Sequence, residues 1–173
     1  GVLSTLNIAL KENNPFLVLQ INSEETPNKE TPIVSQNFLE KIEVYPPGDL
    51  VRSLTERFAL GSIAGKSRFL VLKNNYYSGA FAGMLAWEKN MMGDLRDLLD
   101  LPASKSSNII TTTIGTTTVI SQINQSQFKD SIVANRDARI FKDGSGATIF
   151  LYLFPDNDTI VIANNENTAK IVT

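Results

Sequence analysis

The sequence predicts an α+β fold in which one long amphipathic helix packs on an antiparallel β-meander. Two observations lead to this prediction. Apolar residues recur at helical spacing from Ser78 to Leu99, and the last third of the chain alternates β-rich runs with tight-turn sequences. A helix laid across a sheet lets each element bury its apolar face, so we expect layers, with a ferredoxin-like arrangement among the candidates.

The 173 residues, 42% of them hydrophobic, can build one ordinary core or at most two small ones. Near the N-terminus, the segment from Phe16 to Ile21 is predicted to form a strand that could join the edge of the sheet. The polar run from Asn22 to Thr31, with prolines at 27 and 32, is typical of a loop or linker. We therefore divide the chain into residues 1–32, an N-terminal strand and polar linker, and residues 33–173, the α+β domain.

The next segments predict a helix, a glycine turn and a strand. From Asn37, "NFLEKIEVY" fits a short helix better than a strand. In "PPGDLVRSLTERF" apolar residues again recur at helical spacing, which predicts a helix that Gly61 ends. "RFLVLK", from Arg68 to Lys73, then reads as a strand. The apolar residues of the second helix are Leu50, Val51, Leu54 and Phe58.

The stretch "LGSIAGKSRF" contains GKS and so suggests a phosphate-binding loop. Such a loop requires a strand that leads into a glycine-rich turn and then a helix, whose N–H groups converge on the phosphates. The predicted order here is the reverse. Leu60 also occupies the position where the motif requires its first glycine. We therefore interpret the segment as a simple turn.

The helix from Ser78, its expected N-cap, ends before Pro102. Gly79 and Gly83 should let it approach a neighbouring element closely. Trp87 lies off the apolar stripe, and we interpret it as cover for the rim of the core, with a ligand or partner platform as the alternative. The expected core face consists of Phe81, Met84, Leu85, Met91 or Met92, Leu95, Leu98 and Leu99.

Residues 103–127 are rich in Ser, Thr, Asn and Gln, and Gly115 divides them into two β-prone arms. A hairpin is plausible, and a displayed flexible loop is the alternative. Beyond it, Arg139 to Asn164 reads as three strands joined by "KDGSG" and "PDND" turns. "ENTAKIV" can then begin a final helix.

Composition excludes several kinds of site. The chain has no Cys and no His, which removes thiolate nucleophiles, zinc-thiolate sites and most hydrolase triads. The acidic residues of the long helix fit its solvated side, and "DND" at 156–158 fits a turn better than a calcium site. A net charge of -2 gives no basic field for nucleic acid or an anionic membrane. We predict no catalytic residue, no cofactor and no metal.

Five residues are candidates for an interaction surface: Tyr76, Tyr77, Trp87, Arg136 and Arg139. In "NRDAR" two arginines surround Asp137 just before a strand. A local ion pair at the strand entrance is the favoured interpretation, and a grip on a carboxylate or phosphate is the alternative.

The runs "PPGDLVRSLTERFALG", "RFLVLK", "YYSGAFAGMLAWEKNMMGDLRDLL", "FKDSIVANRDARIFKDGSGATIFLYLF" and "TIVIANNENT" resemble an uncharacterised family of bacterial membrane-anchored envelope proteins. The likeness covers roughly residues 33–173, and "AFAGMLAWE" is its most specific piece. It implies one N-terminal transmembrane helix and an extracytoplasmic domain, but no assigned activity, so no functional residue carries over. The chain contains no apolar run near the roughly 20 residues of a membrane span and starts at Gly1, so we expect the anchor to lie outside this sequence.

These observations favour a non-catalytic extracytoplasmic domain that serves in assembly or in binding a protein partner. The alternative is an enzyme or small-ligand binder that works without His and Cys, using carboxylates, Lys, Tyr76, Tyr77 and Arg. A pocket deep enough to enclose a small ligand, and gathering two or more carboxylates or Arg136 and Arg139 beside an aromatic ring, would favour the alternative. A filled core without such a cleft would favour the interaction domain.

Overall fold

The computed structural model describes residues 2–11, 16–19, 22–23, 31–32, 34–103, 109–114, 117–122 and 127–173. Its helices are α1 (Val2–Leu10), α2 (Ser35–Lys41), α3 (Gly48–Ser53), α4 (Tyr77–Leu99) and α5 (Glu166–Val172). The strands of its main sheet are β1 (Leu17–Leu19), β4 (Leu54–Ile63), β5 (Ser67–Asn74), β8 (Gln127–Val133), β9 (Arg136–Lys142), β10 (Thr148–Asp156) and β11 (Thr159–Ala163). Two short separate pairs are β2 (Asn22–Ser23) with β3 (Thr31–Pro32) and β6 (Ile109–Ile114) with β7 (Thr117–Gln122).

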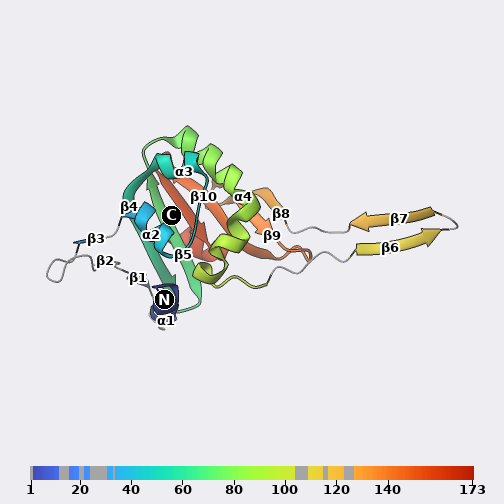
Figure 1. Cartoon of the computed structure of the whole chain (residues 1–173), viewed down its shortest axis with the longest axis horizontal. Coiled ribbons are helices and arrows are strands. Elements are labelled where there is room, and N and C mark those ends of the chain that lie inside the picture. Colours follow the sequence, from blue (N-terminus) through green and yellow to red (C-terminus); the bar gives the residue numbers. More distant parts are fainter. Residues whose placement is uncertain are drawn as a thin grey trace.

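The main sheet is antiparallel throughout, in the order β1-β4-β5-β11-β10-β9-β8 (Figure 1). This confirms the α+β class, the helix on a β-meander and the N-terminal strand at the sheet edge. The order differs from a ferredoxin-like sheet, in which two βαβ units interleave. Here the β8–β11 meander joins the β4–β5 hairpin through the pairing of β11 with β5.

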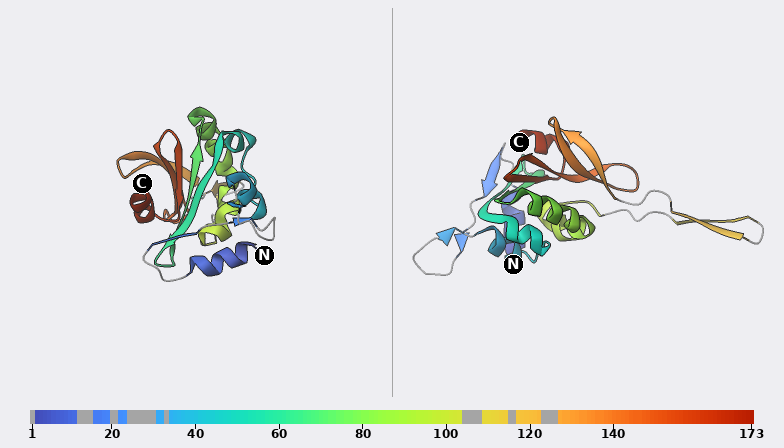
Figure 2. Two further views of the ribbon diagram at one scale, coloured as in Figure 1. Left: turned by 90° about the vertical axis from the view of Figure 1, so that its left-hand side faces the viewer. Right: turned by 90° about the horizontal axis from the view of Figure 1, so that it is seen from above.

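Two hydrophobic layers hold the sheet. Helices α1 to α4 cover one face and α5 covers the other (Figure 2). Because Leu6 and Leu10 of α1 are buried in the larger layer, the N-terminal helix, which the sequence analysis did not predict, belongs to the same core as the rest of the chain. Most of the expected linker lies outside the described residues.

The predicted helix from residue 48 is wrong beyond Ser53, where α3 ends and β4 begins. Leu54, Phe58 and Leu60 lie on the sheet face that packs against the helices, because even spacing keeps strand residues on one face. Gly61 therefore ends no helix. A Cβ at that position would lie 2.2 Å from the Leu17 carbonyl oxygen, so glycine allows β1 to pair with β4.

The GKS sequence lies where β4 turns back into β5, and Ala64 and Gly65 have positive φ angles there. The segment is thus a strand, turn and strand rather than the expected helix, turn and strand. The conclusion that it is no phosphate-binding loop stands, because no helix begins after the turn.

Helix α4 confirms the predicted long helix, although Tyr76 rather than Ser78 is its N-cap and Asp100, at φ 54°, is its C-cap. Gly83 makes the expected close approach, since a Cβ there would lie 2.5 Å from the backbone nitrogen of Leu50 in α3. The expected core face is only partly right. Phe81 and Leu85 are 39% and 40% exposed, and the buried residues are Ala80, Gly83, Met84, Trp87, Met91, Leu95, Leu98 and Leu99.

The C-terminal meander and the final helix are confirmed, and β8 is an additional strand that the sequence analysis missed. Strands β6 and β7 confirm the two arms of the Thr-rich hairpin, which extends away from the main sheet in Figure 1, while its expected turn at Gly115 lies outside the described residues. None of the helices in the described ranges combines the length and the apolar character that crossing a membrane requires.

Candidate binding cleft

One row of paired residues runs across the sheet and changes from apolar to charged. Its apolar end lies beneath the helices, where Leu70 and Ile162 are fully buried. Exposure of the side chain then rises to 23% at Arg139 and 92% at Asp130. From β4 to β8 the row consists of Leu60, Leu70, Ile162, Tyr152, Arg139 and Asp130. The β8 and β9 end of this face therefore projects beyond the cover that α4 provides.

Glu88 connects α4 to the charged end of the row through hydrogen bonds. Its two carboxylate oxygens accept hydrogen bonds from Nε and Nη2 of Arg139, both at 2.7 Å. The hydroxyl of Tyr152 also donates to Glu88, at 2.7 Å. The remaining Arg139 nitrogen, Nη1, donates to Asp130 at 2.8 Å. A bidentate pair of this kind fixes orientation as well as distance.

Tyr152 and Arg139 both keep their protons over the physiological pH range. Burial, followed by the hydrogen bond to Glu88, raises the pKa of Tyr152 well above its ordinary value. The hydrogen bond to Glu88 is the largest cause that raises the pKa of Arg139. Tyr152 therefore remains a hydrogen-bond donor and Arg139 a cation.

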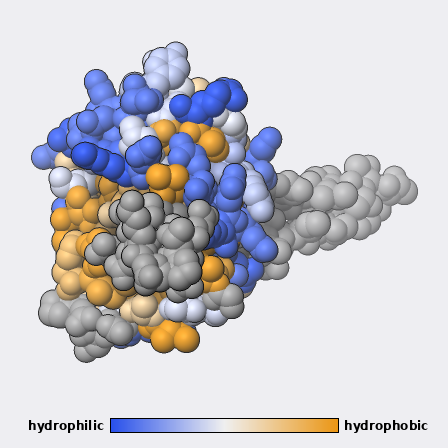
Figure 3. Space-filling view, turned by 60° about the vertical axis from the view of Figure 1, so that its left-hand side comes forward, coloured by the Kyte–Doolittle hydropathy of each residue, from blue (hydrophilic) through white to orange (hydrophobic). Residues whose placement is uncertain are grey.

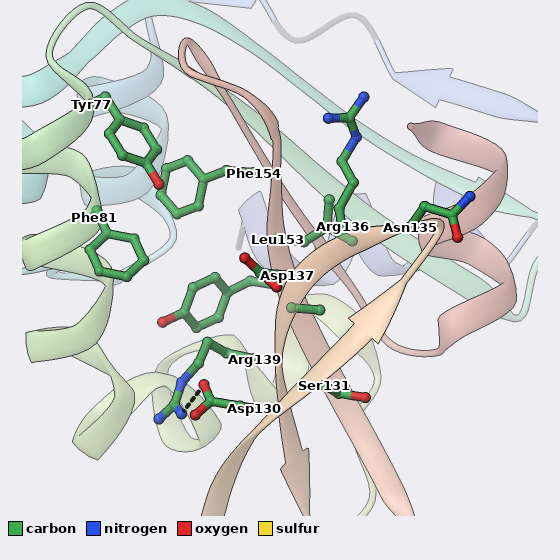
Figure 4. A pocket seen from close by; sticks show the side chains of 12 residues that line it. Tyr77, Phe81, Asp130, Ser131, Asn135, Arg136, Asp137, Arg139, Leu153 and Phe154 are labelled. Atoms are coloured by element: carbon green, nitrogen blue, oxygen red, sulfur yellow. Dashed lines mark hydrogen bonds and ion pairs between the residues drawn. The ribbon is translucent and has the colours of Figure 1, made fainter.

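A cleft of about 640 Å³ opens between the flank of α4 and strands β8 to β10 (Figure 4). We call it the α4 cleft. It is lined by Tyr77, Phe81, Asp130, Ser131, Asn135, Arg136, Asp137, Ala138, Arg139, Tyr152, Leu153 and Phe154. It thus gathers two carboxylates and two arginines beside aromatic rings, which is the arrangement that would favour a ligand site.

Aromatic rings form one wall of the cleft. The centroids of Tyr77 and Phe81 are 5.9 Å apart with the rings nearly parallel, and Phe154 lies 5.2 Å from Tyr77 and 5.9 Å from Phe81. Tyr77, Phe81 and Leu85 are spaced four residues apart, so they form one stripe on α4. All three are about 40% exposed, which makes the stripe an apolar surface that the described part of the chain leaves uncovered.

The two arginines of "NRDAR" act separately. In Figure 4 the side chain of Asp137 points to the side of the cleft where Phe154 lies, whereas that of Arg136 points away. Alternation along β9 explains the difference. Arg139 pairs with Glu88 and Asp130, so the local ion pair that we expected with Asp137 is replaced by contacts from α4 and β8.

The structure also separates the aromatic candidates. Tyr77 and both arginines line the cleft, while Tyr76 is exposed just before α4. Trp87 is fully buried, and its Nε1 donates to Asp94 at 2.7 Å, so it is not available as a platform. Tyr152 and Phe154 as cleft residues, and the contacts of Glu88 with Arg139 and Tyr152, were not predicted from the sequence, because long-range pairing brings these residues together.

The "DND" turn has the local role that we predicted. Asp156 accepts a hydrogen bond from the backbone of Asp158, whose carboxylate pairs with Lys73 at 2.6 Å. Among the described residues no group of three or more acidic side chains is arranged to hold a metal ion.

Apolar side chains are also exposed elsewhere. Figure 3 turns the left-hand side of Figure 1 toward the viewer and shows apolar atoms gathered on the lower part of that face. Ile8 of α1 and Val18 of β1 are among the exposed hydrophobic residues of the chain. Neither residue lines the α4 cleft, where apolar and charged groups lie together, so that cleft remains the candidate site.

Comparisons with protein-family models, with curated proteins and with solved structures gave no match.

Proposed function

We propose that this chain is a non-catalytic domain that binds a protein partner through the α4 cleft. The observation that carries the proposal is the uncovered stripe of Tyr77, Phe81 and Leu85 at the border of the cleft. A helix of a self-contained domain normally places its apolar residues toward the core and polar ones toward solvent. Apolar residues on a second face, beside a cleft with charged walls, are typical of an interaction surface.

The geometry favours binding over catalysis. A general base needs an oxygen or nitrogen that is free to take a proton. Glu88, beside the cleft, accepts from Arg139 and Tyr152, and Asp130 accepts from Arg139, which leaves Asp137 as the lining carboxylate without a hydrogen bond in the described residues. One such group alone does not make an acid–base pair. Glu88, Asp130, Arg139 and Tyr152 thus bind one another, and the aromatic wall is a part of the cleft that can contact a partner. A small-ligand site is the second candidate, because the cleft gathers the carboxylates, arginines and aromatic rings expected of one and its volume is in the range of ligand pockets.

We also propose that the domain works outside the cytoplasm, as part of a bacterial protein anchored in the cell membrane. Two features support this setting. The chain contains no cysteine, which suits an oxidising compartment. Its helix and strand sequences resemble those of the envelope family named above.

Site-directed cross-linking tests the proposed function. Because the chain has no native cysteine, Leu85→Cys introduces a unique attachment site for a benzophenone at the cleft. Lys170→Cys, on the exposed side of α5 across the sheet, is the matched control. In an envelope extract of the cells that produce the protein, we expect one discrete protein adduct from position 85 and none from position 170.

Competition identifies the surface. Excess unlabelled wild-type chain should suppress the adduct, and Phe81→Ser, which removes an exposed ring, should suppress it far less. Equal labelling at both positions, or equal competition by Phe81→Ser, would contradict the proposal. Labelling of a small molecule instead of a protein would favour the second candidate.

A further inference from the structure

We propose that the segment bound in the α4 cleft is basic: a partner polypeptide that places a Lys or Arg side chain beside an apolar residue. This inference rests on the proposed function and adds the chemistry of the partner. It follows from the position of Asp137 and Asp130, on β9 and β8, across the cleft from Tyr77 and Phe81 on α4.

The charges on the cleft side of the sheet do not balance. Asp130 and Asp137 line the cleft and Glu88 lies beside it, so three carboxylates stand against the two guanidiniums of Arg139 and Arg136, and the side chain of Arg136 points away from the aromatic wall. Glu88 takes two of the three Arg139 nitrogens. Within the described residues, the carboxylate of Asp137 has no hydrogen bond or ion pair. The cleft therefore keeps negative charge that a cation can complement.

The charge of Arg139 is already compensated by two carboxylates. Each of its three side-chain nitrogens already donates to a carboxylate, two to Glu88 and one to Asp130. A phosphate or carboxylate in the cleft would have only the two remaining N–H groups of Arg139, beside the carboxylates of Glu88 and Asp130, and would face Asp137. The grip on an anion that "NRDAR" suggested is therefore disfavoured, and attraction of a cation is favoured.

The aromatic wall suits the same ligand. The ring centroids of Tyr77, Phe81 and Phe154 lie 5.2 to 5.9 Å from one another, so the three rings present a continuous aromatic surface. The ring faces attract Lys and Arg head groups, and the exposed ring edges bury an aliphatic or aromatic side chain. Carboxylates beside aromatic rings thus recognise an apolar residue and a neighbouring cation together.

Three short peptides test the charge preference: acetyl-Lys-Phe-Lys-amide, acetyl-Gln-Phe-Gln-amide and acetyl-Glu-Phe-Glu-amide. Each is titrated into the ¹⁵N-labelled chain and followed by chemical-shift changes of the amides of Tyr77, Phe81, Asp137 and Phe154. We expect the basic peptide to bind at least about fivefold more tightly than the neutral one, and the acidic peptide to bind most weakly. Added salt should reduce the preference.

Substitutions test which residues cause the preference for the basic peptide. Asp130→Asn with Asp137→Asn should bring the basic peptide to the affinity of the neutral one and leave the neutral one unchanged. Asp97→Asn with Asp100→Asn, at the other end of α4, removes the same charge and should keep the preference. Phe81→Ser should weaken binding of all three peptides.

Each other outcome overturns the inference. Equal binding of the three peptides at the cleft would leave the proposed function intact and remove the charge preference. Tighter binding of the acidic peptide would show that the arginines control recognition. If the basic peptide causes no shift at these amides, the cleft does not recognise the proposed pair of groups. The cross-linking at position 85 reports separately on whether a protein binds there at all.

Discussion

Glu88 of α4 and Arg139 of β9 lie 51 positions apart in the sequence and form a two-bond ion pair. The side chains are 15% and 23% exposed, so the pair is largely shielded from water. It joins the helix to the outer part of the meander at the point where the row of sheet residues becomes charged. Arg139 also lines the α4 cleft, so the ion pair positions one of the side chains of its wall.

Replacing one partner of this ion pair should lower the free energy of unfolding more than replacing both partners together. Arg139→Met leaves the Glu88 carboxylate without its main partner, and we expect a loss of about 3 kcal/mol in the free energy of unfolding. Glu88→Gln should cost somewhat less. The double variant should be more stable than the sum of the single effects predicts, as urea denaturation of all four chains would measure. Additivity within about 0.5 kcal/mol would contradict the pairing.

Because α4 buries one of its two apolar faces, truncating an apolar residue on each face should change the free energy of unfolding by different amounts. Leu95 is fully buried, so Leu95→Ala should cost about 2–5 kcal/mol in chemical denaturation. Phe81 is 39% exposed, so Phe81→Ala should cost clearly less, about 1 kcal/mol. Equal losses would mean that Phe81 faces the core, as the sequence alone suggested.

Two glycines of α4 should respond in opposite ways to the same substitution. Gly83→Ala places a Cβ within 2.5 to 2.7 Å of Leu50 and should destabilise the chain by about 1–3 kcal/mol, because α3 must move. A Cβ at Gly93 meets no atom within 4 Å, so Gly93→Ala should stabilise by about 1 kcal/mol through helix propensity. Thermal and urea unfolding of both variants measure the difference. A neutral Gly83→Ala would contradict the close contact between α3 and α4.

Asp158 should titrate unusually low. The hydrogen bond from Lys73, followed by that from Thr159, lowers the pKa of Asp158 to about 2. Because the folded pKa lies below the ordinary value of about 3.9, the stabilisation is fully present above that value and is lost as the pH falls through about 2. Carboxyl ¹³C NMR of the folded chain would follow the titration. Lys73→Met should move the midpoint toward 4, and Lys129→Met, on exposed β8, should leave it unchanged.

The sequence predicted the parts of the fold that local chemistry decides. Turn sequences separate the strands of the meander, and the long apolar pattern before Pro102 identifies α4. Residues 54–60 were misassigned for a specific reason. A spacing of four, as between Leu54 and Phe58, places two residues on the same face of a helix and also of a strand. The pairing of Phe58 with Leu72 and of Leu60 with Leu70 makes this segment a strand.

By itself, the sequence determined an α+β chain without cysteine or histidine chemistry, with a long helix and a C-terminal meander. Only the tertiary structure decided which side of α4 is buried, because that helix has apolar residues on two faces and the packing of α3 and the sheet selects one. The apolar residues of the other face remain exposed and form the candidate interaction surface; they are Tyr77, Phe81 and Leu85. Glu88, Arg139 and Tyr152 meet through sheet register and helix placement, which depend on contacts far apart in the chain and leave no local pattern.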